Sequence, residues 1–208
     1  MSANFIIITG TNGVGKSTIG QNFSKQLQIP FINIDLFYFD KYKAYREYTQ
    51  DEIIETSKEI FALREHYFKT KQSFIQETII TESKKILALL EKAKEYGFNT
   101  SLFYIGIDQE DVEISNWRVI NRTKKGLHYV KPKDIQANLK DVNACFKELC
   151  EHFDNVCIYD NEDFPKKILD IRNKEIYKKD NILSDFCLNL IQDTFIDELI
   201  KSKKQIKL

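Results

Sequence analysis

The sequence predicts an α/β fold of three layers, in which helices cover both faces of a central, mostly parallel, five-stranded sheet. Two observations support this fold. Short β-branched and aromatic runs alternate along the chain with longer segments whose apolar residues recur every three or four positions. A glycine cluster follows the first of these runs and leads directly into a helical segment. We expect one domain over residues 1–208, because this length suits a single hydrophobic core.

The glycine cluster is the most informative segment of the sequence. Residues 4–9 form a predicted buried strand, and residues 17–27 form a predicted helix with Ile19, Phe23 and Leu27 on one face. Between the two, the chain matches the pattern G-x-x-x-x-G-K-[ST] with Gly10, Thr11, Asn12, Gly13, Val14, Gly15, Lys16, Ser17 and Thr18. In this strand–loop–helix setting the pattern is a phosphate-binding loop, or P-loop, and it predicts a P-loop NTPase fold.

The residue types of the P-loop suit the phosphates of a nucleotide. Glycines allow the left-handed backbone conformations that turn N–H groups toward phosphate oxygens, and the helix N-terminus adds its positive dipole end. Lys16 is expected to reach the β- and γ-phosphates, and the Ser17 hydroxyl is expected to bind Mg²⁺. We therefore predict ATP or GTP as phosphoryl donor and Mg²⁺ as cofactor.

The remaining elements are expected in order along the chain. Asp134 is a predicted helix N-cap and Gly97 a predicted helix stop. We expect a strand over 30–35, a short helix or loop over 36–48, a helix over 49–69, a strand over 73–78, a helix over 82–96, a strand over 100–107, a helix over 108–123, an irregular basic stretch over 124–132, a helix over 134–152, a strand over 155–161, a hairpin from 165 with its turn near Asn173 and Lys174, and a final helix over 183–200.

Charged residues at strand ends and on one helix are candidates for catalysis. Asp35 is expected at a strand end beside the P-loop strand, where it would act as general base, position Mg²⁺ or cap the next helix. Glu77 ends another strand and would bind a substrate hydroxyl or lie in solvent. Arg118 and Arg122 share one helix face and, within a lid over residues 118–133, would stabilise the transferring phosphoryl group; the alternative is a solvated face.

Composition excludes several classes of protein. The chain has 31 Lys and Arg against 31 Asp and Glu, and a zero net charge makes nucleic acid an unexpected partner. It has no apolar run that could span a bilayer and no signal-peptide pattern, so we expect a cytoplasmic protein without membrane contact. The four cysteines match no zinc pattern and are expected in the core.

Several motifs together resemble the zeta-toxin family of P-loop kinases, and they span about residues 5–161 in the order of that family. They are the P-loop, Asp35, Phe74-Ile-Gln-Glu77-Thr78, Gly97-Phe98, Arg118-Val-Ile-Asn-Arg122, Gly126-Leu-His128-Tyr-Val130 and Tyr159-Asp160-Asn161. The chain departs from the family at Leu127 and Lys131, where Gly and Pro are usual, and at Ala137-Asn138-Leu139, where relatives carry an Arg-Tyr pair.

The resemblance implies phosphorylation of a small hydroxylated molecule, which in toxin members is a UDP-amino sugar such as UDP-N-acetylglucosamine. It implies that Asp35 is the general base, that Arg118 and Arg122 stabilise phosphoryl charge, and that an antitoxin protein is a possible partner. Expected substrate-binding residues are Glu77, Thr78, Tyr42, Arg46 and His128.

Two other functions stay open from the residues themselves. The aromatic segment from Phe37 to Tyr48 suits a pocket that stacks on a ring, so the acceptor could be a nucleoside, a sugar acid, an antibiotic or a nucleic-acid 5′-hydroxyl. A nucleotide-binding module without transfer activity is the third reading, because the altered lid motif could have lost catalysis.

Overall fold

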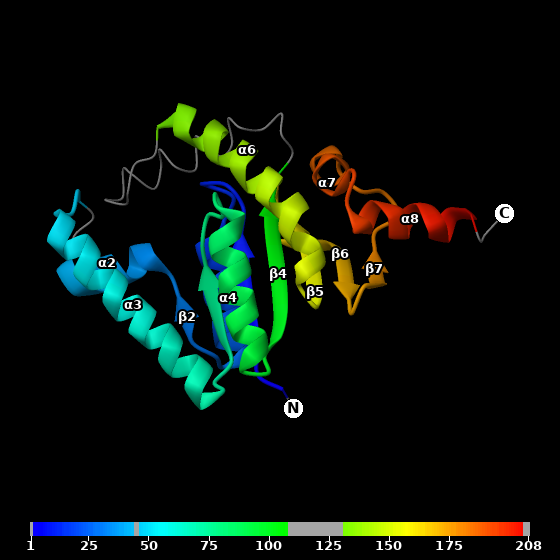
Figure 1. The fold of residues 1–208 in the computed structure, drawn as a ribbon. Coiled ribbons are helices and arrows are strands. Elements are labelled where there is room, and N and C mark those ends of the chain that lie inside the picture. The colour runs from blue at the N-terminus through cyan, green and yellow to red at the C-terminus, as the bar shows by residue number, and fades with distance from the viewer. Residues whose placement is uncertain (1, 44–45, 108–130, 206–208) are drawn as a thin grey trace.

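The computed structural model describes residues 2–43, 46–107 and 131–205, and in these residues seven strands form one sheet. The order across the sheet is β2-β3-β1-β4-β5-β6-β7 (Figure 1). The strands are β1 (Asn4–Thr9), β2 (Phe31–Ile32), β3 (Phe74–Glu77), β4 (Asn99–Gly106), β5 (Asn155–Asp160), β6 (Lys166–Arg172) and β7 (Glu175–Lys179).

The sheet confirms the predicted α/β class. Strands β2, β3, β1, β4 and β5 are parallel, so their carboxyl ends lie along one edge. In the β1–β3 register Ile8 lies opposite Glu77. The predicted hairpin, β6–β7, adds two antiparallel strands to the same sheet. Its turn residues, Asn173 and Lys174, both have a positive φ, as a two-residue hairpin turn requires.

Helices lie on both faces of the sheet, as expected. Alternate residues of β1 point to opposite faces: Ile6 and Ile8 pack with Ile19 of α1, whereas Phe5 and Ile7 belong to the core under α4 and α6. Figure 1 shows α4 and α6 crossing in front of the sheet. The helices are α1 (Lys16–Leu27), α2 (Ile34–Tyr42), α3 (Gln50–Thr70), α4 (Ser83–Glu95), α6 (Pro132–Leu149), α7 (Asp185–Ile191) and α8 (Phe195–Gln205), and a 3₁₀ turn (Cys150–His152) follows α6.

Three element boundaries differ from the expectation. The second strand is short, so Asp35 lies in the first turn of α2 and not at a strand end, and Asn33 is the N-cap. Helix α6 begins at Pro132, because proline suits the first helical position, and Asp134 falls in its first turn instead of capping it. The expected final helix is two helices, because Asp193 adopts a left-handed conformation between them.

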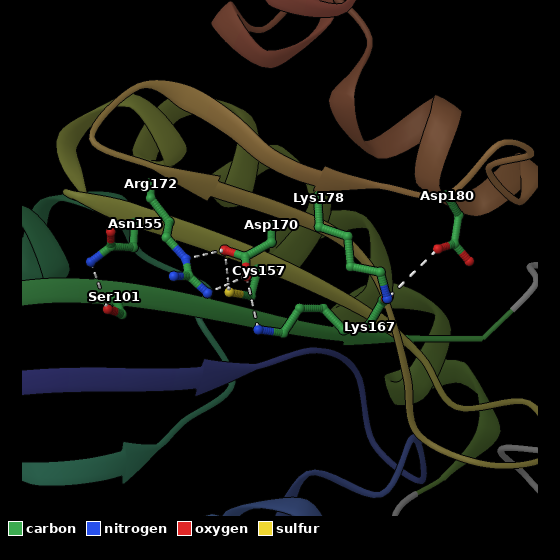
Figure 2. A network of polar contacts seen from close by, with 8 residues as sticks. All are labelled: Ser101, Asn155, Cys157, Lys167, Asp170, Arg172, Lys178 and Asp180. Atoms are coloured by element: carbon green, nitrogen blue, oxygen red, sulfur yellow. Dashed lines mark hydrogen bonds and ion pairs between the residues drawn. The ribbon is translucent and has the colours of Figure 1, made fainter.

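A polar network lies on the sheet at β5 and β6 (Figure 2). Asp170 is 2% exposed and accepts hydrogen bonds from Lys167 (3.0 Å) and Arg172 (3.0 and 3.3 Å). The Cys157 thiol lies 3.5 Å from the same carboxylate. Burial alone would raise the pKa of Asp170, but the hydrogen bonds from Arg172 and Lys167 lower it overall. Paired in this way, a carboxylate is accommodated in a buried position.

Two expectations on composition can be compared with the structure. All four cysteines are buried and free of disulfides. Among the described helices, none combines the length and apolar character that a membrane span needs.

The predicted helix over 108–123, and residues 124–130 of the basic stretch, lie outside the described residues.

Candidate active site

The P-loop joins β1 to α1 at the carboxyl edge of the sheet and has the backbone that the sequence predicts. Gly10, Gly13 and Gly15 all have a positive φ. A Cβ atom at Gly10 would lie 2.2 Å from the backbone oxygen of Ile105, and one at Gly15 would lie 2.4 Å from Asn161 Nδ2. The positive φ favours glycine at both positions, and at Gly10 the backbone of β4 leaves no room for a side chain.

Lys16 and Ser17 begin helix α1, where backbone N–H groups are available to an anion. The Lys16 side chain is buried, and its Nζ donates a hydrogen bond to the Thr11 backbone oxygen within the loop (2.6 Å). The ammonium group is thus held over the loop that is expected to surround the phosphates.

The Ser17 hydroxyl lies beside two side chains from other elements. Its Oγ donates a hydrogen bond to Glu77 Oε1 at 3.0 Å, and Asn33 Nδ2 lies 3.4 Å from the same Oγ. Asn33 Nδ2 also donates to Glu77 Oε2. Glu77 was expected to bind a substrate hydroxyl, and the structure places its carboxylate against the P-loop serine. Its position at the end of β3, next to β1, explains this contact.

The charges around Glu77 lie close together. Burial raises the pKa of Glu77, while the charge of Lys16 and hydrogen bonds from Ser17 and Asn33 lower it in part. The negative charge of Asp35 adds to the upward shift. Asp35 itself is exposed. The structure therefore brings Lys16, Ser17, Glu77 and Asp35 to one region at the carboxyl edge of the sheet.

These oxygen donors fit a magnesium ion. Mg²⁺ prefers hydroxyl, carboxylate and water oxygens, and Ser17 Oγ and Glu77 Oε1 are such donors 3.0 Å apart. Next to a loop that exposes backbone N–H groups, this donor set can hold a metal ion that neutralises phosphate charge.

Three asparagines support the site, and the sequence analysis assigned a role to only one of them. Asn12, a predicted P-loop residue, accepts a hydrogen bond from Asn138 Nδ2 of α6 (2.9 Å). Asn161 Nδ2 donates to the Val14 backbone oxygen (2.8 Å), and its backbone N–H donates to the Gly106 oxygen. The position of Asn161 directly after β5 is a sequence signal for such a contact, whereas no local pattern identifies Asn138.

Helix α6 makes a second contact with the P-loop. The Thr11 hydroxyl, which is buried, donates to the backbone oxygen of Ile135 (3.1 Å). Together with the Asn12–Asn138 hydrogen bond, this contact ties residues 11 and 12 to the first two turns of α6. The amino-terminal turns of the helix that follows the expected lid are therefore in direct contact with the phosphate loop.

The aromatic segment forms a cluster at α2 and the start of α3. The Tyr38 and Tyr48 rings stack with centroids 4.2 Å apart, and the Tyr42 ring lies 5.4 Å from that of Tyr48. The Arg46 guanidinium lies over the rings of Tyr42 and Tyr48 (5.4 and 5.1 Å). Arg46 also forms two hydrogen bonds with Glu52, at 2.6 and 2.9 Å, which fix its plane.

The other predicted site residues lie in different parts of the chain, and some of them are outside the described residues. Thr78 follows β3, and its backbone N–H donates to the Ile8 oxygen (3.0 Å). Tyr42 and Arg46 belong to the aromatic cluster. Arg118, Arg122 and His128 lie outside the described residues.

Comparison with known proteins gives one family. The family model of zeta toxins matches residues 2–175 of the chain. No curated protein matches it in sequence. The chain is similar to a structure from the PezAT chromosomal toxin–antitoxin system of Streptococcus pneumoniae, with 17% identity and a TM-score of 0.62. That alignment covers 99% of this chain and 86% of that chain.

Two further solved structures have the same fold. One is a chain in the structure of the AvrRxo1-ORF1:AvrRxo1-ORF2 complex, with 14% identity and a TM-score of 0.67. The alignment covers 92% of this chain and 66% of that chain. A structure of that complex with ATP is 14% identical with a TM-score of 0.62, over 85% of this chain and 60% of that chain. At these identities the likeness establishes a common fold.

Proposed function

Because the chain belongs to the zeta toxin family of P-loop kinases, we propose that it transfers the γ-phosphate of ATP or GTP to a hydroxyl of a small molecule. The observation that carries this proposal is the contact of Ser17 Oγ with Glu77 Oε1 beside Lys16. A P-loop lysine, a hydroxyl and a carboxylate from the neighbouring strand are the groups that phosphoryl transfer requires on the donor side.

Mg²⁺ would be held by Ser17 and, directly or through water, by Glu77. When bound, it would neutralise charge on the phosphate oxygens. On the protein's side, the backbone N–H groups of the P-loop would bind phosphate oxygens, and Lys16 would exchange its hydrogen bond with the Thr11 oxygen for one with the nucleotide. Arg118 and Arg122 are proposed to add positive charge from the lid.

Asp35 is the proposed general base. It lies in the first turn of α2 and is exposed, so that a substrate can reach it. Its negative charge contributes to the raised pKa of Glu77. A carboxylate in this position would accept the proton of the attacking hydroxyl, hold the oxygen in line with the γ-phosphate and release the proton to solvent.

The acceptor is proposed to carry a ring. Asp35, Tyr38 and Tyr42 recur at helical spacing on α2, so the aromatic cluster continues from the proposed base along one side of that helix. Tyrosine rings and a fixed guanidinium bind sugar or nucleobase faces and phosphate groups. A UDP-amino sugar has all of these parts, and a nucleoside or a ring-bearing antibiotic has some. Thr78 and His128 are proposed to contribute to acceptor binding as well.

The first experiment is an assay of ADP release by the purified protein with Mg²⁺, with and without UDP-N-acetylglucosamine, followed by mass spectrometry of the acceptor. We expect release that depends on the acceptor and a product heavier by one phosphoryl group. Lys16→Ala is the blank. Asp35→Asn is expected to abolish transfer while it retains nucleotide affinity, and turnover by that variant would remove Asp35 as the base.

A panel of other acceptors separates the alternatives. Phosphorylation of a nucleoside, a sugar acid or an antibiotic, but not of the UDP-sugar, would keep the reaction class and change the substrate. Nucleotide binding with no transfer to any acceptor would contradict the kinase proposal and favour a binding module. Family membership also makes an antitoxin-type protein a proposed partner, to be sought by co-purification.

A further inference from the structure

Asn33 lies between β2 and α2, where three elements of the site meet. Asn33 is 5% exposed, and both the oxygen and the nitrogen of its side-chain amide form hydrogen bonds. The Oδ1 atom accepts from the Leu36 N–H at 2.9 Å and so caps α2. The Nδ2 atom donates to Glu77 Oε2 and approaches Ser17 Oγ at 3.4 Å. One side chain thus touches α2, β3 and the P-loop helix.

The chemistry of these partners fixes which way the amide faces. The Leu36 N–H can only donate, and an ionised Glu77 carboxylate can only accept. If the amide were flipped, its NH₂ group would face the Leu36 N–H, donor against donor. Its oxygen would face the Glu77 carboxylate, acceptor against acceptor. A helix cap alone does not explain asparagine here, because Asp and Ser cap helices about as well. The amide NH₂ is the part of Asn33 that Asp and Ser lack.

We propose that Asn33 is a positioning residue that holds Glu77 against Ser17 on the metal side of the P-loop. The same amide fixes the first turn of α2, which carries Asp35. Asn33 thereby sets the distance between the two carboxylates, one beside the metal-binding hydroxyl and one beside the acceptor. This inference rests on the proposed function for the identity of the metal site, but it can be tested by binding alone.

The test compares Asn33→Asp, Asn33→Ser and a matched control. Both substitutions keep a capping oxygen for Leu36 and remove the amide NH₂ that donates to Glu77. Ser is too short to span both partners, and Asp places a second carboxylate against Glu77. The control is Thr100→Val at the amino end of β4, the edge of the sheet opposite to the P-loop. It loses two hydrogen bonds of the buried Thr100 hydroxyl, which donates to Asp154 Oδ2 (2.8 Å) and accepts from the Asp154 N–H (3.2 Å). It reports the effect of lost hydrogen bonds at a buried residue away from the site.

The main readout is the dissociation constant of ATP with Mg²⁺ and with EDTA. In the unaltered protein we expect Mg²⁺ to tighten binding. In Asn33→Asp we expect that gain to fall at least roughly tenfold, the scale of one hydrogen bond to a charged group, with the EDTA value within about threefold. Asn33→Ser should lie between the two, and Thr100→Val should keep the full gain.

A second readout is the Mg²⁺ concentration for half-maximal turnover. This concentration should rise in Asn33→Ser, and excess Mg²⁺ should restore the turnover of that variant. A merely structural role would lower turnover at every Mg²⁺ concentration, and that result would overturn the inference. So would an unchanged Mg²⁺ gain in both Asn33 variants. If Asn33→Asp does not fold, Asn33→Ser decides. Absence of acceptor phosphorylation by the unaltered protein would contradict the kinase proposal separately, because the binding readout does not require transfer.

Discussion

At the scale of single residues, two glycines with a positive φ differ in what surrounds them. A Cβ at Gly10 would meet the Ile105 backbone oxygen at 2.2 Å, whereas a Cβ at Gly97 would meet nothing within 4 Å. We predict that Gly10→Ala displaces the P-loop and abolishes nucleotide binding. Gly97→Ala should cost about 1 kcal/mol of stability, from left-handed strain alone.

Isothermal titration with ATP and thermal unfolding measure these two effects. Gly97→Ala serves as the control for backbone strain, because it should lower the midpoint of unfolding and leave the ATP affinity unchanged. An ATP affinity in Gly10→Ala equal to that of Gly97→Ala would contradict the importance of the close approach of the loop to β4.

The second residue-scale prediction concerns Glu77 without nucleotide. Burial raises the pKa of this carboxyl in the folded state, so the folded protein binds the proton more tightly than the unfolded chain does. Stability contributed by the protonated form is present below the unfolded pKa, near 4.3 by the usual value, and is lost as the pH rises through the folded pKa. Glu77→Gln should not suffer this loss.

We therefore predict that the free energy of unfolding of Glu77→Gln increases, relative to the unaltered protein, as the pH rises from 4 to 7. Urea denaturation at a series of pH values measures the difference. A constant offset at all pH values would reflect only the changed hydrogen bonds to Ser17 and Asn33 and would contradict the raised pKa.

Sequence patterns predict the residues whose proposed roles are local. Lys16 and Ser17 were predicted from a nine-residue pattern, because a P-loop is defined by its own backbone and by the helix that follows. Asn33 and Asn138 were not predicted, because their partners lie 44 and 126 residues away. An asparagine before a helix indicates a cap, but which group the other end of its amide meets is decided by the packing of strands.

At the scale of elements, the sequence predicted the presence of the described strands and helices better than their limits. Helix α3 is capped by Thr49 in a complete capping box, a strong local signal, and its bounds agree with the prediction to one residue. The break between α7 and α8 was missed. No Gly or Pro marks it, and Asp193 takes a left-handed conformation that a periodic apolar pattern does not reveal.

Helix α6 gives the element-scale prediction. Asn138 contacts the P-loop at Asn12, while Asn143 on the same helix accepts a hydrogen bond from the Tyr104 hydroxyl (2.5 Å) in the core. We predict that Asn138→Ala weakens ATP binding roughly fivefold to tenfold, the scale of one hydrogen bond, and changes stability little. The P-loop would lose one of its two hydrogen-bonded links to α6 and keep the one from Thr11 to the Ile135 oxygen.

Asn143→Ala is the matched control, because it should destabilise the fold and leave ATP affinity near that of the unaltered protein. Titration calorimetry and urea denaturation on both variants separate the two effects. Equal losses of ATP affinity in both variants would show that α6 acts through overall stability and not through its contact with Asn12.

At the scale of the whole molecule, the carboxyl edge of one sheet gathers the site. Strand β1 leads into the P-loop, β3 brings Glu77, and β5 brings Asn161. This convergence follows from parallel strands and was predictable once the strand order was assumed. The extension of the sheet by β6 and β7 was predicted only as a hairpin, because sequence does not say which edge a hairpin joins.

Buried residues of α7 and α8 belong to the same hydrophobic cluster as those of the central strands. Phe186 of α7 is 3% exposed, and its ring packs on β4, where a Cβ at Gly106 would lie 2.4 Å from it. Gly106 in turn accepts the backbone N–H of Asn161, which supports the P-loop. We propose, on this continuity, that residues 1–208 unfold as one domain.

The prediction that tests one domain uses two neighbours on α7. Phe186→Ala removes a buried ring and should cost about 3–5 kcal/mol, whereas Leu188→Ala, with 49% of the residue exposed, should cost less than about 0.5 kcal/mol. Because the core is shared, circular dichroism and release of a fluorescent nucleotide should give one coincident transition in all three proteins, at a lower midpoint in Phe186→Ala. Two transitions in Phe186→Ala, with nucleotide retained through the first, would mean that α7 and α8 unfold apart from the P-loop, and the domain would then end with the sheet.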